Sequence, residues 1–350
     1  MSIRLINDKL RSFFQIKKDE DLDVILEKLG CGFLVEKNDH RTIANKIMCE
    51  KYIKTYFREC ATLFQDMIDE NIIFAVLKGA VLSSQIYHQN GVKIPRDIDI
   101  FVSLNDVNLL KSIMLKNGFI QGRVLSGEII PFDRTQQVFY SRYTHQQAPW
   151  VKKTRDEICP YICVDINTRL LWGESEEKED LSGFLTLGSV EPYNVCGVDL
   201  YKLKKEYEFI ALCLHHYKDL NSIYLLYSQG VKLKHFVDVY LYVNELCLDP
   251  YEVLRICKNY QLVKYVYYCV TASNSIFNDR KLSEFQSIFY DEKYDNILDE
   301  YGLTKTESYK WEITLKDRIQ CGNLQEYFNK KLSSYEKNKI NTNLFYLNLL

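Results

Sequence analysis

The chain has 350 residues, enough for more than one domain of common size. Its 45 Lys and Arg residues are balanced by 47 Asp and Glu residues, so the basic excess typical of proteins that bind nucleic-acid backbones is absent. We expect neither a signal peptide nor a membrane span, because residues 1–23 are highly charged and no apolar run approaches about 20 residues. The 11 irregularly spaced cysteines contain no Cys-x-x-Cys pair, and we interpret them as reduced thiols of a cytoplasmic protein.

The N-terminal part of the chain, over residues 1–70, is expected to be helical. Between residues 45 and 70 apolar side chains recur at steps of three and four, which indicates one amphipathic helix; they are Met48, Tyr52, Ile53, Tyr56, Phe57, Cys60, Leu63, Phe64 and Met67. After residue 70 the spacing of the apolar residues changes. The apolar run 72–77 predicts a buried strand, and residues 80–89 predict a helix that follows it after a turn at Gly79.

Further strands and helices alternate as far as about residue 200. Acidic and apolar residues alternate from residue 97, which predicts a strand, and residues 105–117 predict a helix that ends at Gly118. Residues 136–143 and 161–170 are strand-like. From about residue 200 onward the chain carries only helical stripes, at 206–219, 233–246 and 250–270. We therefore expect an α+β fold with a small mixed sheet, divided into segments 1–70, 71–200 and 201–350.

Two of the predicted strands carry aspartates on one face. Residues two apart in a strand point the same way, so Asp97 and Asp99 share a face while the apolar residues between them enter a core. On the later strand, Asp165 shares its face with Cys163 and Asn167. If the two strands are neighbours, the three carboxylates form one site. Neighbouring carboxylates repel each other unless a cation lies between them, and two Mg²⁺ ions held in this way suit phosphoryl transfer.

A lysine and a glycine end the first predicted strand. Gly79 allows the backbone to approach a phosphate, and the N-terminus of the following helix favours negative charge. Lys78 and Arg96 would each add a positive charge beside a bound triphosphate. The order strand, Lys-Gly turn, helix, Asp-x-Asp strand and later Asp strand is more specific than any of its parts.

This order resembles the polymerase-β-like nucleotidyltransferase superfamily. More narrowly, residues 76–119 resemble a bacterial family of uncharacterised nucleotidyltransferases, and the similarity spans roughly residues 60–270. The residues that carry it are Leu77-Lys78-Gly79, Tyr87, Arg96, Asp97 to Ile100, and Gly118-Phe119. The resemblance implies a small mixed nucleotidyltransferase sheet with flanking helices, preceded by a helical segment and followed by a helical domain.

Two positions depart from the patterns of these relatives. The superfamily has Gly-Ser in the first turn, whereas this chain has Gly79-Ala80, so a phosphate contact must come from backbone N–H groups, Lys78 or Ser83. The narrower family has a His two residues after the later Asp, where this chain has Asn167. Neither departure removes a predicted metal ligand.

The resemblance implies an Mg²⁺-dependent enzyme that moves an NMP group from an NTP, with ATP the expected donor, to a hydroxyl of an acceptor. Asp97 and Asp99 would ligate the metal ions, and Asp165 would complete the metal site and hold or deprotonate the acceptor hydroxyl. We expect a small molecule, a sugar or a peptide as acceptor. One alternative is a toxin-like enzyme that modifies protein or tRNA, although the near-neutral charge disfavours tRNA as the acceptor. The other alternative is a non-catalytic nucleotide-binding scaffold.

Each of these residues also has a purely structural interpretation. Asp97 and Asp99 would then be solvated charges at the edge of a strand, Asp165 an ion-pair partner of Arg169 or Arg96, and Lys78 the end of a strand. The histidines of the middle and C-terminal parts are interpreted as loop or core residues whose contribution stays open; they are His145, His215, His216 and His235.

Overall fold

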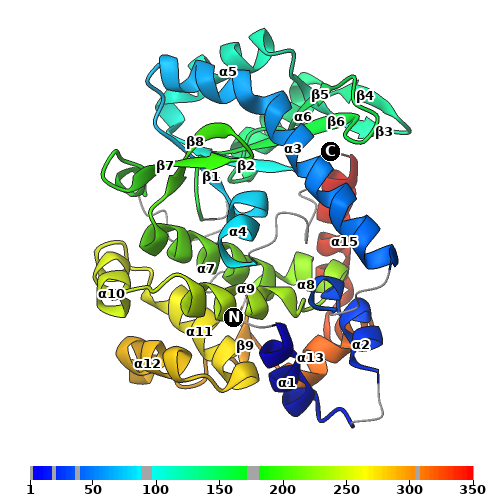
Figure 1. Cartoon of the computed structure of the whole chain (residues 1–350). Coiled ribbons are helices and arrows are strands. Elements are labelled where there is room, and N and C mark those ends of the chain that lie inside the picture. Colours follow the sequence, from blue (N-terminus) through cyan, green and yellow to red (C-terminus); the bar gives the residue numbers. More distant parts are fainter. Residues whose placement is uncertain are drawn as a thin grey trace. The chain divides into compact units, whose positions relative to one another are not determined.

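The computed structural model describes residues 3–17, 21–35, 40–87, 97–171, 181–303 and 308–349. The chain forms two compact units, one made of Asn38–Ala211 and the other of Met1–Lys37 together with Leu212–Leu350 (Figure 1). These units differ from the three consecutive segments expected from the sequence, whose independence as domains stays a prediction. None of the described helices combines the length and apolar character that a membrane crossing needs.

A mixed sheet forms the centre of the first unit. Its described strands follow the order β1 (Phe74–Leu77), β2 (Ile98–Val102), β6 (Tyr161–Asn167), β5 (Trp150–Lys153), β3 (Ile120–Leu125) and β4 (Glu128–Pro131). β2 and β6 are parallel, whereas the other neighbouring pairs are antiparallel. Together with the helices around it, this sheet confirms the predicted α+β fold.

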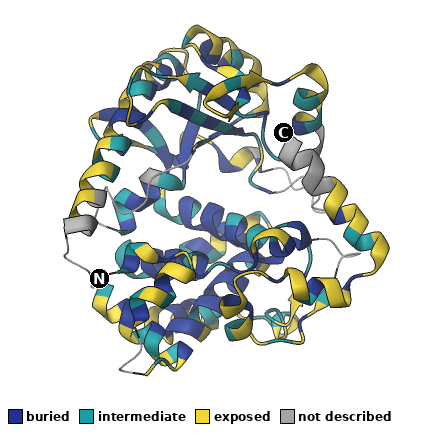
Figure 2. Ribbon diagram, turned by 90° about the vertical axis from the view of Figure 1, so that its right-hand side faces the viewer, coloured by how far each residue is buried: buried dark blue, intermediate teal, exposed yellow. Residues whose placement is uncertain are grey.

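One face of this sheet is covered by the long helix α3 (His40–Asp69) and by α5 (Val107–Lys116). The stripe predicted between residues 48 and 67 supplies buried side chains such as Phe57 and Phe64, although Met48 is exposed. The Phe64 ring stacks on Phe74 of β1 with centroids 5.9 Å apart. All residues of β1 and all but one of β2 are buried, in agreement with this core, and Figure 2 shows buried strands at the centre of this unit. Burial of apolar area on this face is the main force that holds α3 against the sheet.

A hairpin of β7 (Val190–Val195) and β8 (Val198–Leu203) extends the unit, with β8 lying against β1 and α3. Cys196 and Gly197 form its two-residue loop, and both have positive φ angles, 56° and 86°. Two-residue loops with positive φ at both positions match the right-handed twist of hairpin strands. Asn194 secures the loop by accepting a hydrogen bond from the backbone N–H of Gly197 at 3.0 Å. The sequence reading did not identify this hairpin.

Residues 136–143, expected to be strand-like, lie in helix α6 (Arg134–Tyr143) instead. The helix starts with a capping box: the Asp133 side chain accepts from Gln136 N–H at 2.8 Å, and the Gln136 side chain accepts from Asp133 N–H at 3.0 Å. This reciprocal pair satisfies two N–H groups that would otherwise lack partners at the helix start. The strand prediction was wrong because the local apolar alternation was weighed without this N-terminal signal.

The second unit is predominantly helical, as expected of the C-terminal part. The helix α7 (Lys205–Asn221) starts in the sheet unit, and its residues from Leu212 onward belong to the helical unit. The other helices are α1 (Ile3–Phe14), α2 (Leu22–Lys28), α8 (Ile223–Gln229), α9 (Lys234–Glu245), α10 (Pro250–Asn259), α11 (Val263–Phe277), α12 (Arg280–Phe289), α13 (Leu315–Cys321), α14 (Gln325–Lys331) and α15 (Ser334–Leu349). A two-residue strand pair, β9 (Glu300–Tyr301) and β10 (Tyr309–Lys310), lies among them.

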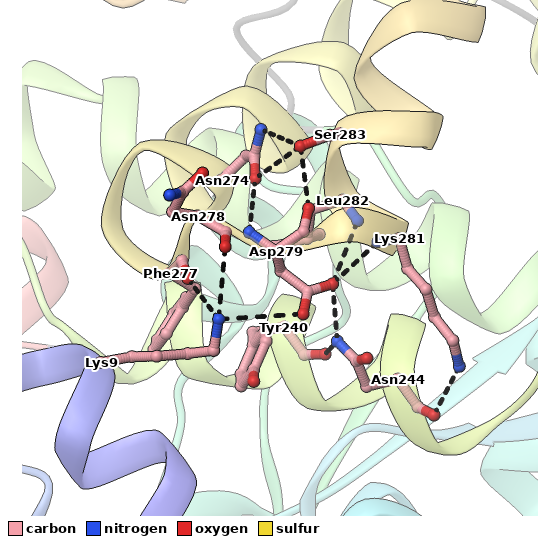
Figure 3. Close-up of polar contacts among 10 residues, drawn as sticks. All are labelled: Lys9, Tyr240, Asn244, Asn274, Phe277, Asn278, Asp279, Lys281, Leu282 and Ser283. Carbon is pink, nitrogen blue, oxygen red and sulfur yellow. Dashed lines mark hydrogen bonds and ion pairs between the residues drawn. The ribbon is translucent and has the colours of Figure 1, made fainter.

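Lys9 on α1 connects the N-terminal residues to the C-terminal helices (Figure 3). Its ammonium group donates to the backbone carbonyls of Phe277 at 2.7 Å and Asn278 at 3.3 Å, at the end of α11. The last carbonyls of a helix lack partners within it and carry partial negative charge, so a lysine is favoured there. Asp279, 4.0 Å from the same ammonium, caps the next helix by accepting from the N–H groups of Lys281 and Leu282. These contacts explain why residues 1–37 group with the C-terminal helices.

Candidate active site

The turn between β1 and α4 (Gly79–Ile86) is abrupt. β1 ends at Leu77 and α4 begins at Gly79, so Lys78 alone connects them. Lys78 has φ 50° and ψ −150°, and Gly79 has φ 53°. A positive φ is unusual for a residue with a side chain and costs about 1–3 kcal/mol in the less populated regions, so the surroundings must hold it. In this conformation the Lys78 ammonium lies 3.5 Å from Oδ2 of Asp99.

Asp99 and Asp165 are brought together by the parallel pairing of β2 and β6. The pairing sets Ile98 opposite Val164 and Asp99 opposite Asp165. Ile98 and Val164 are buried in the core under α3, so the two aspartates face the other side of the sheet and remain partly accessible. The alternation of apolar and acidic residues in the two strands therefore places the carboxylates of Asp99 and Asp165 next to each other.

Asn167 orients the carboxylate of Asp99. Its side-chain amide donates to Oδ1 of Asp99 at 3.0 Å, while Lys78 approaches Oδ2, so each oxygen of Asp99 faces one nitrogen group. Asn167 is itself only 3% exposed, which limits the motion of this amide. Sequence reasoning did not assign this role, although its signal was present: Asn167 follows Asp165 at a spacing of two and therefore shares its face.

Asp97 lies immediately before β2 and is exposed. It lies near Cys163, which shares a face of β6 with Asp165. Burial, followed by the carboxylates of Asp165 and Asp97, raises the pKa of the Cys163 thiol to about 11. Cys163 is therefore a neutral thiol near pH 7 and a poor nucleophile. Its surroundings show that the three predicted aspartates border one region of the sheet.

Two tyrosines flank the Asp165 strand. The Tyr56 hydroxyl, from α3, donates to the backbone carbonyl of Cys163 at 2.6 Å and accepts from its N–H at 3.0 Å. Tyr140, from α6, interacts electrostatically with Asp165. Burial raises the pKa of Tyr140 to about 12, with a further contribution from the Asp165 carboxylate, while Arg123 opposes the shift. Tyr140 therefore stays protonated at neutral pH.

The donor set suits Mg²⁺ that is shared with a substrate. Among the described residues, no group of three or more His, Cys, Asp or Glu side chains is arranged to hold a metal ion by itself. Mg²⁺ is usually held by one or two carboxylates, waters and substrate phosphates and seldom by a cage made of protein groups alone. The Asp97 and Asp99 carboxylates fit this mode, and the ammonium of Lys78 beside Asp99 shows that the site favours positive charge.

Two further predicted contacts to the nucleotide remain predictions. Ser83 lies on α4 one turn after Gly79 and is only 2% exposed, so its side chain is buried in this structure. Arg96 lies outside the described residues.

His145 is partly buried, and its backbone carbonyl accepts from the N–H groups of Thr168 and Arg169 at 3.1 and 3.3 Å, just after β6.

Three of the candidate histidines gather in the helical unit between α7 and α9. His215 and His235 each lie 3.4 Å from Oδ2 of Asp219, and His216 lies 3.4 Å from Oδ2 of Asp238. Burial lowers the pKa of His235 to about 3, and burial also lowers the pKa of His216. Both rings are therefore neutral near pH 7. This cluster is a set of buried polar contacts between two helices, and its contribution to function stays open.

Comparison with known proteins assigns the chain to a family. A family model described as "Uncharacterised nucleotidyltransferase" matches residues 38–278, and the chain belongs to this family. Membership supports nucleotidyl transfer as the class of reaction and hence a transferase. The resemblance to a family of uncharacterised nucleotidyltransferases, inferred from the Lys-Gly turn and the aspartate strands, is thereby confirmed.

One of the solved structures that match the chain is only distantly similar. It is described as an antigenic nucleotidyltransferase-like protein from Paracoccidioides brasiliensis, with 15% sequence identity and a TM-score of 0.32. The similarity covers 55% of this chain and 76% of that chain. No curated protein matches the chain.

Proposed function

We propose that this protein is a metal-dependent nucleotidyltransferase that transfers an NMP group from an NTP to a hydroxyl of an acceptor. The observation that carries the proposal is the pairing of Asp99 with Asp165 beside the turn formed by Lys78 and Gly79. Carboxylates and a Lys-Gly turn in one place supply the two kinds of group that a Mg²⁺-bound triphosphate requires.

The donor nucleotide would bind at the turn between β1 and α4. The backbone N–H groups at the start of α4 favour negative charge, and Gly79 has no side chain to keep a phosphate away. Lys78 would move from Asp99 to a phosphate oxygen, a short displacement for a flexible side chain. Asp97 and Asp99 would hold two Mg²⁺ ions together with the phosphates, and Asn167 would keep Asp99 in a fixed orientation. Bound Mg²⁺ neutralises the phosphate oxygens and thereby favours attack at phosphorus.

The acceptor would meet the donor at Asp165. This carboxylate would bind the acceptor hydroxyl and take its proton while the hydroxyl oxygen forms a bond to the α-phosphorus. The bond from the α-phosphorus to the bridging oxygen breaks at the same centre, and pyrophosphate leaves with that oxygen. We propose a small molecule, a sugar or a peptide as acceptor, because the net charge of −2 provides no excess of positive charge for a nucleic-acid backbone.

Nucleotide binding by calorimetry tests the proposal. ATP, GTP, CTP and UTP are titrated with and without Mg²⁺ into the wild type, Asp99→Asn and the control Asp106→Asn. Asp106 is an aspartate of the same unit whose side chain does not cap the helix it precedes. The proposal expects Mg²⁺-dependent binding of at least one nucleotide, lost in Asp99→Asn and kept in the control. A wild type that binds none of the four would contradict the proposal. Binding that is equally strong without Mg²⁺ and in Asp99→Asn would favour a non-catalytic nucleotide-binding scaffold.

A further inference from the structure

A buried polar network fastens the end of α4 to the elements that follow the sheet. Lys202 of β8 and Glu208 of α7 have side chains only 5% and 4% exposed, and their charged groups lie 3.8 Å apart. Gln85 of α4 donates its amide to both oxygens of Glu208, at 3.0 and 3.1 Å. Lys202 also pairs with the more exposed Glu191 at 2.5 Å. All of these residues belong to the sheet unit.

Burying the charged groups of this network costs free energy, so the network is stable only in a well-defined geometry. A buried carboxylate loses the hydration of both oxygens, and the loss is offset only where a counter-charge and well-directed hydrogen bonds replace the water. Glu208 obtains the counter-charge from Lys202 and the hydrogen bonds from Gln85. Rotation or translation of α4 would remove the amide from both oxygens at once, so Glu208 fixes α4 in position and orientation.

A second contact supports the same attachment. The hydroxyl of Ser84, next to Gln85, lies 2.8 Å from the hydroxyl of Tyr193 on β7. The ammonium of Lys202 lies 5.4 Å from the centre of the Tyr193 ring, within the range of a cation–π contact. Two consecutive residues of α4 are thus held by the hairpin β7–β8 and by the first turns of α7.

The attached end of α4 lies close to the turn that begins it. Six residue steps separate Gly79 from Gln85, which at about 1.5 Å per residue is roughly 9 Å of helix. A short helix moves as one body, so holding Gln85 also holds the turn. Positive φ angles at Lys78 and Gly79 persist only where the surroundings determine them. We propose that Glu208, acting through Gln85, positions the Lys78–Gly79 turn for nucleotide binding.

This role rests on the proposed function, and two measurements separate the two. The first is hydrogen exchange of the backbone amides of residues 79–87 without nucleotide, which reports how firmly α4 is held. The second is the dissociation constant of the preferred NTP with Mg²⁺. The variant is Gln85→Met, which removes the amide, keeps the chain length and leaves Glu208 paired with Lys202. The control is Leu110→Ala, which removes a buried side chain from α5 and lowers stability away from α4.

We expect Gln85→Met to speed exchange in residues 79–87 and to weaken nucleotide binding by on the order of tenfold, whereas Leu110→Ala changes neither to the same degree. The double variant Gln85→Met/Glu208→Gln tests whether Glu208 acts through Gln85. If it does, the factor by which the double variant weakens nucleotide binding should be smaller than the product of the factors for the two single variants. If hydrogen exchange in residues 79–87 is unchanged in Gln85→Met, or if Leu110→Ala weakens nucleotide binding as much, the positioning role of Glu208 is overturned. The proposed function would stand in either case. A wild type that binds no nucleotide would overturn the proposed function, and the exchange data would still show whether Gln85 holds α4.

Discussion

Asp99 and Asp165 are direct partners across the parallel strands β2 and β6, although 66 positions separate them in the chain. Parallel pairing places side chains of matched residues on the same face of the sheet. The same pairing buries the apolar neighbours of both residues, so the aspartates cannot turn inward without exposing the core. A shift of one residue in register would move one of the carboxylates away from the other.

The two aspartates are predicted to have separable roles. Asp99→Asn should weaken Mg²⁺-dependent NTP binding at least tenfold, because a metal ligand loses its charge, on the order of 1.4 kcal/mol or more. Asp165→Asn should leave NTP binding within about threefold and lower the transfer rate by about 10²–10⁴-fold, the usual contribution of a general base. Calorimetry and the release of pyrophosphate with a turnover-supporting acceptor measure the two effects. If both variants lose NTP binding equally, both aspartates act as metal ligands and the separate role of Asp165 as general base is contradicted.

The faces of the site strands were predictable from sequence because alternation at period two depends only on local geometry. The apolar partners of Asp99 and Asp165 identify the buried side of each strand, and the Lys-Gly step marks the turn after β1. That the two strands are neighbours followed from the family resemblance and not from the pattern itself, since adjacency in a sheet is a long-range property.

Other features of the fold and the site were not predicted from the sequence. The capping box is visible in the sequence as Asp133 followed three residues later by Gln136, but the strand prediction considered only the apolar alternation of the residues after it. The network of Gln85, Lys202 and Glu208 joins residues up to 123 positions apart, and no local pattern connects them. The role of Asn167 required the distance to Asp99, because the sequence shows only that Asn167 shares a face with Asp165.

Asn167 is expected to matter for nucleotide binding more than for folding. Asn167→Leu removes the amide that holds Oδ1 of Asp99 and keeps the volume of a buried side chain. We expect Mg²⁺-dependent NTP affinity to fall by about fivefold to tenfold, or about 1–1.4 kcal/mol, which is part of the roughly 1.5–3 kcal/mol that a hydrogen bond to a charged group contributes. Asn167→His, which keeps a ring N–H donor, should recover part of this loss. Calorimetry at fixed Mg²⁺ measures both, and equal affinities in Asn167→Leu and wild type would contradict the role.

Lys9 is expected to stabilise the helical unit. Lys9→Met keeps the aliphatic stem but removes the donor to the carbonyls of Phe277 and Asn278 (Figure 3). We expect a loss of about 1–2 kcal/mol, because the bonds are charge-assisted but the site is partly exposed. Denaturant unfolding of the full chain measures the loss, and hydrogen exchange of α1 shows where it acts. Lys17→Met, at a position after α1, is the control. An α1 that exchanges no faster in Lys9→Met would disprove the anchoring role.

The buried histidines should make the helical unit sensitive to acid. The folded state lowers the pKa of His235 to about 3 and lowers that of His216, whereas an exposed histidine has a pKa near 6.5. The unfolded state therefore binds more protons below pH 6.5, and the stability present above that pH is lost as the pH falls toward the folded pKa values. Burial raises the pKa of Asp219, but its neighbours, His215 foremost among them, hold that pKa well below its usual range, so Asp219 extends the loss to lower pH.

The slope should reach up to about 1.4 kcal/mol per pH unit for each histidine. Denaturant unfolding between pH 7.5 and 5 measures it, with His235→Phe as the variant and His145→Phe as the control on the sheet unit. His235→Phe should lower the number of protons taken up on unfolding by about one, since a phenylalanine does not titrate in either state. The His145→Phe variant shows how much of the slope comes from a histidine of the sheet unit. A wild-type stability that is constant from pH 7.5 to 5 would show that the histidines are as easily protonated in the fold as in the open chain.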